Sequence, residues 1–183
     1  MTVVGAGRLK KGETVLIHGA AGGCGHFAVQ IAKAVGATVI ATASESTIDF
    51  VKELGADHVI NYKTQNFVEE TNKITNGRGV DLVYDTVGGE TVSKSIGCTA
   101  PFGRIVSIVS IAGDINGGIG KNLTINLLFS PRNRETLLAL KDLVDQGKLK
   151  VHIHKTFPLN QVADAHRMIE AGGTHGKIVL IVD

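Results

Sequence analysis

The stretch Thr14-Val-Leu-Ile-His-Gly-Ala-Ala-Gly-Gly-Cys-Gly25 decides the fold of this chain. A short apolar run leads into a glycine-dense turn, and an amphipathic pattern from His26 to Val35 follows directly. The apolar run is typical of a strand buried on both faces, and the spacing after it is typical of a helix. The stretch therefore predicts a β-strand, a tight turn and a helix.

The glycines of this turn indicate phosphate binding. A phosphate pair binds at a helix N-terminus when free N–H groups and the helix dipole point at it and no side chain intervenes. In the dinucleotide fingerprint G-x-G-x-x-G, the glycine positions correspond to Ala20, Gly22 and Gly25. Ala20 departs from the fingerprint, and we expect Gly19 to take over the turn. Because glycine is abundant (23 of 183 residues), a plain connecting turn is the alternative.

A P-loop is the nearest rival among phosphate-binding motifs. It requires Gly-Lys-Ser or Gly-Lys-Thr at the start of the helix, and this chain has Gly25-His26-Phe27 there. The dinucleotide motif is therefore favoured.

The composition predicts one globular domain. With 43% hydrophobic and 20% charged residues, 183 residues suffice to bury a sizeable core. The formal charge is only +2, and no run of five or six basic residues is present. We therefore expect neither a nucleic-acid nor a membrane partner.

The cysteines and the N-terminus indicate a cytoplasmic protein. Cys24 and Cys98 form no C-x-x-C pair, so they predict neither a disulfide framework nor a zinc site. The first residues lack the basic start and apolar core of a signal peptide, and no apolar stretch reaches the ~18 residues that span a bilayer.

The rest of the chain alternates strand and helix patterns. We expect strands at 38–42, 58–61, 80–84 and 104–109, and β segments at 123–129, 151–157 and 177–182. Residues 111–120 are loop-like. This alternation predicts an α/β fold with a doubly wound parallel sheet, the three-layer αβα Rossmann fold. Ligands of such sheets lie beyond the carboxyl ends of the strands.

Three helix starts have local signals. Ser46, with Asp49 three residues later, predicts a capping box for a helix ending at Leu54. Asn66 is expected to cap a helix that ends near Ile74, and Asn160 a helix that ends near Ala171. A further helix is expected from 133 to 146.

Five segments together carry a family resemblance: 9–25, Leu54-Gly-Ala-Asp-His-Val-Ile-Asn-Tyr62, Gly79-Val-Asp-Leu-Val-Tyr-Asp85, Phe102-Gly-Arg-Ile-Val106 and Thr174-His-Gly-Lys-Ile-Val179. With them the chain resembles the cofactor-binding half of the medium-chain dehydrogenase/reductases, most closely the zinc-independent quinone oxidoreductase-like branch. The resemblance implies that a reduced nicotinamide cofactor, usually NADPH, delivers hydride to a quinone, enone or related carbonyl.

The resemblance also implies a missing half. Family members are roughly twice as long, and an N-terminal β-rich domain supplies most of their substrate pocket. Residues 1–183 would then be the dinucleotide-binding domain alone, and residues 174–183 would hold the strand that joins the other domain in the family. An uncovered apolar edge promotes association, so we expect 177–182 and 123–129 to make a homo-oligomer.

The resemblance assigns residues to the cofactor. Ala21, Gly22, Gly23 and Cys24 match positions whose backbone holds the pyrophosphate. Tyr62 matches a position near the adenosine phosphate, and Val87, Ile108, Val109 and Ser110 match positions beside the nicotinamide. The backbone does the binding at the turn, so Cys24 is not expected to be a nucleophile.

The choice between NADP and NAD depends on the end of the second strand. Glu45 lies where a ribose-binding carboxylate belongs, although it falls just past the strand end. The turn holds no Lys or Arg, but Ser44 and Ser46 can hydrogen-bond a phosphate. Together with Tyr62, these hydroxyls favour NADP(H), with NAD(H) as the alternative.

We expect no catalytic residue and no metal. Asp85 is expected to be a hydrogen-bonded structural carboxylate, because the proton donor for an enone belongs beside the substrate. His152 and His154 alternate on a β segment without a third ligand at sensible spacing. Two other functions remain open: an enoyl-reductase module of a polyketide or fatty-acid assembly line, and a non-catalytic dinucleotide-sensing protein.

Overall fold

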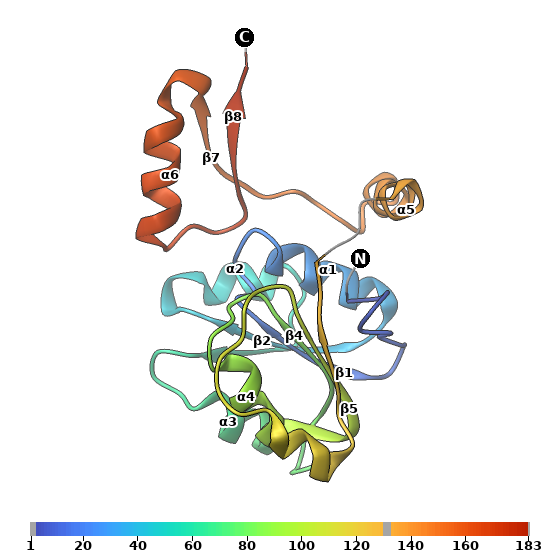
Figure 1. Cartoon of the computed structure of the whole chain (residues 1–183). Helices are drawn as coiled ribbons and strands as arrows, with labels where there is room; N and C mark the ends of the chain where they lie inside the picture. Colours follow the sequence, from blue (N-terminus) through green and yellow to red (C-terminus); the bar gives the residue numbers. More distant parts are fainter. Residues whose placement is uncertain (1–2, 130–132, 183) are drawn as a thin grey trace.

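The computed structural model describes residues 3–129 and 133–182. Six strands form a parallel sheet in the order β3-β2-β1-β4-β5-β6 (Figure 1). They are β1 (Thr14–His18), β2 (Thr38–Ala43), β3 (His58–Asn61), β4 (Val80–Asp85), β5 (Thr99–Ser107) and β6 (Thr124–Leu127). The strand order reverses beside β1, so the expected doubly wound Rossmann fold is confirmed.

Helices cover both faces of this sheet. α1 (Gly25–Val35) and α2 (Ile48–Glu53) lie on one side, and α3 (Phe67–Ile74) and α4 (Thr91–Ser95) on the other (Figure 1). Successive residues of β1 therefore enter different cores: Ile17 packs with residues of α1, and Leu16 packs with Phe67 of α3. Within the described ranges, no helix combines the length and apolar character that crossing a bilayer requires.

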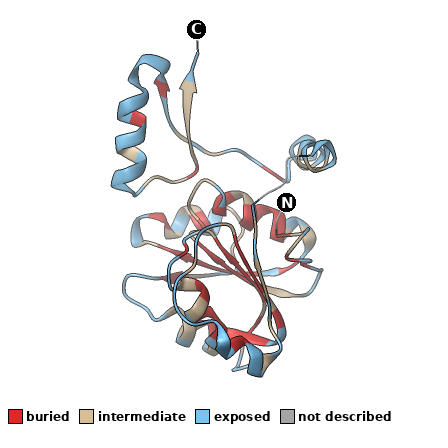
Figure 2. Cartoon of the chain, viewed as in Figure 1, coloured by how far each residue is buried: buried red, intermediate tan, exposed pale blue. Residues whose placement is uncertain are grey.

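The C-terminal residues form a second unit. It contains α5 (Arg134–Asp145), β7 (Ile153–Pro158), α6 (Val162–Ala171) and β8 (Lys177–Ile181). β7 and β8 pair in parallel, outside the six-stranded sheet. In Figure 2 most buried residues, in red, lie in and around the six-stranded sheet, whereas the residues of this unit are mostly intermediate (tan) or exposed (pale blue).

Hydrogen bonds attach the second unit to the glycine turn and to α1. The Gly176 amide donates to the Ala21 carbonyl at 2.8 Å. The side chain of Gln30 in α1 also donates to the Lys150 carbonyl at 3.0 Å and accepts from the Lys150 amide at 2.8 Å. β8 therefore begins directly beside the turn that was predicted to bind phosphate.

Two of the predicted helix caps are wrong. A 3-10 turn, Glu45–Thr47, precedes α2, and the Ser44 hydroxyl contacts those of Ser46 and Thr47 at 3.2 and 3.1 Å. No side-chain capping bond forms at the start of α2, because these hydroxyls bind one another. A 3-10 turn, Leu159–Gln161, likewise replaces the Asn160 cap of α6.

The cap at Asn66 is confirmed. Its side chain accepts from the amides of Val68 and Glu69 at the start of α3. Asn133 caps α5 in the same way, by accepting from the Thr136 amide at 2.8 Å.

The fifth strand differs from its predicted bounds. β5 begins at Thr99 instead of Arg104 and ends at Ser107 instead of Val109. Its pairing with β4 shifts register between Val80 and Leu82, and Phe102 has a positive φ of 60°. An irregularity of this kind accommodates a proline within a strand, which periodicity alone does not reveal. The loop-like stretch 111–120 is also partly ordered, because a 3-10 helix covers Asn116–Lys121.

Candidate dinucleotide-binding site

The glycine turn between β1 and α1 has the predicted backbone path. Gly19 adopts a left-handed φ of 67°, which favours glycine. The Ala20 amide then donates to the Thr42 carbonyl of β2 at 3.2 Å, and the Gly22 amide donates to the Gly19 carbonyl at 3.0 Å. Gly19 thus makes the turn in place of the fingerprint's first glycine, as expected.

Gly25 permits the close approach of helix to strand. A Cβ at this position would overlap the Gly19 carbonyl oxygen and lie 2.7 Å from the Ala20 Cα. The first hydrogen bond into α1 joins the His26 amide to the Gly22 carbonyl at 3.1 Å. The positive end of the α1 dipole therefore lies at the turn, which is the arrangement that stabilises a bound phosphate.

A cleft of about 510 Å³ opens above this turn, at the carboxyl ends of the strands. All the predicted cofactor residues except Ser110 line it: Ala21, Gly22, Gly23, Cys24, Ser44, Ser46, Tyr62, Val87, Ile108 and Val109. Ser110 lies just outside, where its carbonyl accepts from the Gly89 amide at 3.0 Å. The fold thus brings together residues from five separate loops.

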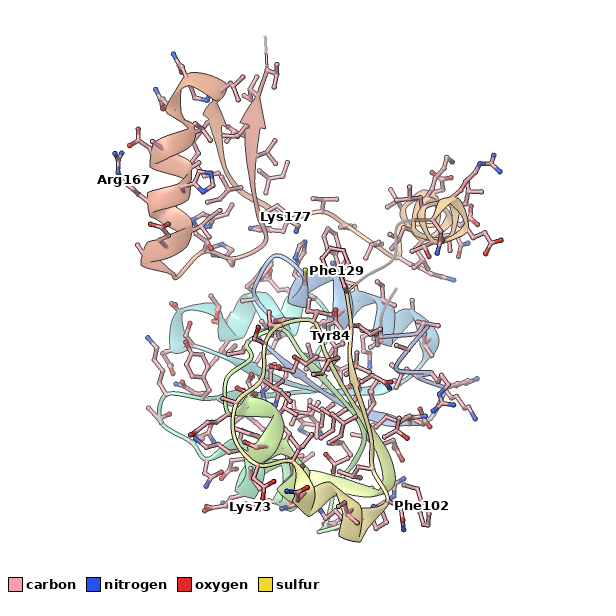
Figure 3. The ribbon with its side chains drawn as sticks, in the orientation of Figure 1. Lys73, Tyr84, Phe102, Phe129, Arg167 and Lys177 are labelled. Carbon is pink, nitrogen blue, oxygen red and sulfur yellow. The ribbon has the colours of Figure 1, made fainter. Side chains whose placement is uncertain are left out.

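Two lysines in the cleft were missed from the sequence. Lys63 follows Tyr62 directly, and Lys177 is the first residue of β8. The Lys177 ammonium lies 3.2 Å from the position that a Cβ of Gly23 would take and 5.9 Å from the centre of the Phe27 ring. In Figure 3 Lys177 lies at the base of β8, on the side facing the six-stranded sheet. The cleft is therefore cationic, although the turn that follows β2 holds no basic residue.

Glu45 faces away from the cleft. Its carboxylate accepts a hydrogen bond from the side-chain Nδ2 of Asn61, at the end of β3, over 2.6 Å. Glu45 does not line the cleft. Ser44 and Ser46 line the cleft instead. The residues of the cleft that follow β2 therefore carry hydroxyl groups, where a ribose-binding carboxylate was the alternative.

Two more hollows adjoin the cleft. One, of about 700 Å³, shares Gly19, Thr42, Tyr62 and Val87 with it and extends toward α3 and α4. The other, of about 490 Å³, shares Cys24 and Ile108 and is lined mainly by apolar residues, some of them from α1 and α5. An extended ligand therefore has room to continue on either side of the glycine turn.

Asp85 is a structural carboxylate, as expected. It is fully buried and accepts from the amides of Val87 and Gly88 and from the Ser107 hydroxyl, at 2.7 to 3.2 Å. These bonds fix the loop that carries Val87 into the cleft.

Comparison with known proteins identifies the family. Residues 54–180 match the family model described as zinc-binding dehydrogenase. The chain is 38% identical to the 2-haloacrylate reductase of a Burkholderia species, over 95% of this chain and 57% of that protein. It is 34% identical to a component of the phenolphthiocerol/phthiocerol polyketide synthase of Mycobacterium tuberculosis, over 96% of this chain and 9% of that protein.

A solved structure gives the same result. The quinone oxidoreductase from Coxiella burnetii superposes with a TM-score of 0.88 at 37% identity, over 100% of this chain and 56% of that one. The chain thus spans a little over half the length of the reductases that it matches.

The described residues do not fit the zinc ion in the family's name. No group of three or more His, Cys, Asp or Glu side chains among them is arranged to hold a metal. His152 and His154 do approach His175, but as packed rings with centroids 5.0 and 4.5 Å away. Burial also raises the pKa of the Cys98 thiol to about 11, which disfavours the thiolate that zinc requires.

The glycine turn, the strand order and the comparisons agree. The chain belongs to the zinc-binding dehydrogenase family, within the medium-chain dehydrogenase/reductase superfamily of NAD(P)-dependent oxidoreductases.

Proposed function

We propose that this chain is the NADP(H)-binding domain of an oxidoreductase that transfers hydride to a quinone, enone or related carbonyl compound. The observation that carries the proposal is the cationic cleft above the glycine turn, with Glu45 turned away from it. When bound, the nicotinamide cofactor supplies the hydride.

The residues of the cleft have distinct roles in this proposal. The backbone from Ala21 to Cys24 and the Lys177 ammonium hold the pyrophosphate, because free amides and a cation both stabilise its charge. Tyr62 packs near the adenosine. Val87, Ile108 and Val109 position the nicotinamide within the cleft, and Ser110, which lies just outside the cleft, is proposed to act from beside them.

The preference for NADP(H) rests on the side chains that follow β2 and β3. Ser44, Ser46 and Lys63 line the cleft, and a phosphate on the ribose gains hydrogen bonds and a cation from them. A carboxylate in the cleft would repel such a phosphate. The carboxylate of Glu45 is hydrogen-bonded to Asn61 instead and does not line the cleft. NAD(H) would gain nothing from Lys63.

Calorimetric titration with NADPH and NADH tests the cofactor. We expect NADPH to bind at least about tenfold tighter, which is about 1.4 kcal/mol. Lys63→Gln should remove most of that difference and leave NADH affinity unchanged. Lys141→Gln is the matched control, since Lys141 lies on α5 and pairs with Asp145. Tighter binding of NADH would overturn the NADP(H) assignment and return the ribose role to Glu45.

In this proposal the acceptor binds to a substrate domain that is separate from the dinucleotide-binding domain. Since the chain spans 57% of the 2-haloacrylate reductase, we propose that the substrate domain accounts for the difference and that these residues include no catalytic residue and no metal ligand. The isolated chain should therefore bind NADPH and oxidise it very slowly with a quinone acceptor. Fast turnover by the chain alone would contradict this division.

The similarity to a polyketide synthase favours a second candidate, an enoyl-reductase module. An assay of the full-length protein separates the two functions. The module would reduce an enoyl thioester on an acyl carrier in preference to a free quinone, and the free-standing reductase would show the reverse. Dinucleotide binding without either activity would favour the sensing function.

We also propose self-association in the cytoplasm, with no nucleic-acid or membrane partner. β6 forms the edge of the six-stranded sheet, and the exposed fraction of Leu127 is 57%. An unpaired edge of this kind favours strand pairing between copies. Sedimentation should reveal a dimer that Leu127→Lys weakens, and a monomer at all concentrations would refute it.

A further inference from the structure

His18 has a hydrogen-bond environment that the cofactor site does not explain. It is the last residue of β1, immediately before the glycine turn, and only 2% of it is exposed. Its ring and that of Phe67 in α3 form a T-shaped contact with centroids 4.7 Å apart, and His18 lines the 700 Å³ hollow. Both ring nitrogens have partners from other elements: Thr42 of β2 and Ser95 of α4.

The bond at Ser95 determines where the ring carries its proton. The Ser95 hydroxyl donates to the Thr91 carbonyl at 2.6 Å, so its single hydrogen is already used. We assign the hydroxyl oxygen as the acceptor toward His18 Nε2, because that contact, at 3.0 Å, is longer than the contact with the Thr91 carbonyl. Nε2 carries the proton, and Nδ1 of the neutral ring is left as an acceptor.

The bond at Thr42 extends this chain of donors to the glycine turn. Since Nδ1 accepts, the Thr42 hydroxyl donates to it at 3.2 Å. The Thr42 oxygen is then free to accept from the Gly19 amide at 3.4 Å. The Thr42 carbonyl holds the next amide, that of Ala20, at 3.2 Å. These hydrogen bonds form one chain that runs from the Gly19 amide through Thr42, His18 and Ser95 to the Thr91 carbonyl. Each donor in the chain has one acceptor.

We propose that His18 is a positioning residue for the dinucleotide site: as the neutral Nε2–H tautomer, it ties α4 to β2 and orients the Thr42 hydroxyl that holds the Gly19 amide. The role in binding rests on the proposed function. The tautomer does not, since it follows from the free protein's hydrogen bonds. Thr42 lines both the cleft and the 700 Å³ hollow, and His18 lines the hollow.

The charges around the ring are consistent with a neutral imidazole. Asp85 of β4 favours the protonated form, but burial outweighs it and lowers the pKa of His18 to about 4. On α4, Lys94 pairs with Glu90 at 2.9 Å, so these opposite charges offset each other. Thr42, Ser95 and Phe67 carry no charge. The ring therefore stays neutral at physiological pH, and the hydrogen bonds from Gly19 to Thr91 are kept.

The tautomer is measured directly by nitrogen NMR of the histidine rings in the free protein. We expect a protonated Nε2 and an unprotonated Nδ1 for His18, unchanged on adding NADPH. A protonated Nδ1 would overturn the proposal, whatever the protein binds.

The role in binding is tested at Thr42, because His18 variants can fail to fold. Thr42→Val should weaken NADPH and NADH equally, about three- to tenfold, because both share the glycine turn. Thr42→Ser restores the hydroxyl and should restore affinity. Thr38→Val, the same change at the exposed start of β2, is the control.

Each outcome of the titration has one meaning. All measurements are made at a temperature where every variant remains folded by circular dichroism. If Thr42→Val binds as tightly as the unmodified chain, the positioning role is refuted. If the unmodified chain binds neither dinucleotide, the proposed function fails, and the NMR result alone still decides the tautomer.

Discussion

The six-stranded sheet and the C-terminal unit contain similar strands but differ in what covers them. In β1 every residue after Thr14 is buried, whereas no residue of β8 is buried. α1 buries seven of its residues, and α5 buries none. The apolar sequences Val15-Leu-Ile17 and Ile178-Val-Leu-Ile181 predict the same kind of strand. The difference shows that an apolar run indicates what a segment can bury, not whether the fold supplies a partner.

Packing should make the two regions respond differently to the same substitution. Ile105 of β5 is fully buried, and half of Ile181 in β8 is exposed. Ile105→Ala should lower the free energy of unfolding by about 2–5 kcal/mol, through lost burial and a cavity. Ile181→Ala should cost less than about 1 kcal/mol. Urea unfolding measures both. Equal costs would mean that β8 is covered in solution, and a dependence on protein concentration would identify a second copy as the cover.

The buried His18 should make stability depend on pH. Its pKa in the folded protein is about 4, below the usual 6.5, so the unfolded chain takes up a proton first as the pH falls. The contribution to stability is complete above pH 6.5 and is lost progressively toward pH 4. The loss amounts to about 3 kcal/mol.

Urea unfolding across that range checks this contribution. His18→Gln should flatten the pH dependence, and His166→Asn on α6 of the C-terminal unit should leave it unchanged, because His166 is exposed. An NMR titration that places the His18 pKa near 6.5 would contradict the prediction without any variant.

The attachment between the regions should be weak enough to break separately. Gln30→Ala removes the two bonds to the Lys150 backbone, at a cost of about 1–2 kcal/mol. Hydrogen exchange should then accelerate in β7 and β8 but not in β1 or β4. Gln146→Ala, at the exposed end of α5, is the control. Faster exchange throughout the chain would mean that the two regions unfold together.

Much of the fold could be predicted from the sequence, since alternating periodicities and the glycine turn specify strands, helices and their layers. Helix starts were less predictable. The cap at Asn66 formed, but Ser46 and Asn160 lie in 3-10 turns. At Ser46 the hydroxyl of Ser44 binds the hydroxyl that was expected to cap the helix.

The site was predictable where the backbone or the loop position determines it. Ala21 to Cys24, Tyr62 and Val87 lie in the cleft because strand ends meet there. Lys63 and Lys177 were missed, although Lys177 lies in a segment that carried the family resemblance. Nothing in that segment shows that β8 begins beside Gly23, since this proximity depends on the hydrogen bond between Gly176 and Ala21.

The sequence by itself determined that a dinucleotide turn follows a buried strand, because Gly19 and Gly25 satisfy local backbone requirements that few other residues meet. Only the tertiary structure decided the chemistry around that turn. It turned Glu45 toward Asn61, brought Lys177 to the cleft and gave His18 two hydroxyl partners. Local conformation depends on neighbours in the chain, whereas charge and hydrogen bonding at a site depend on neighbours in space.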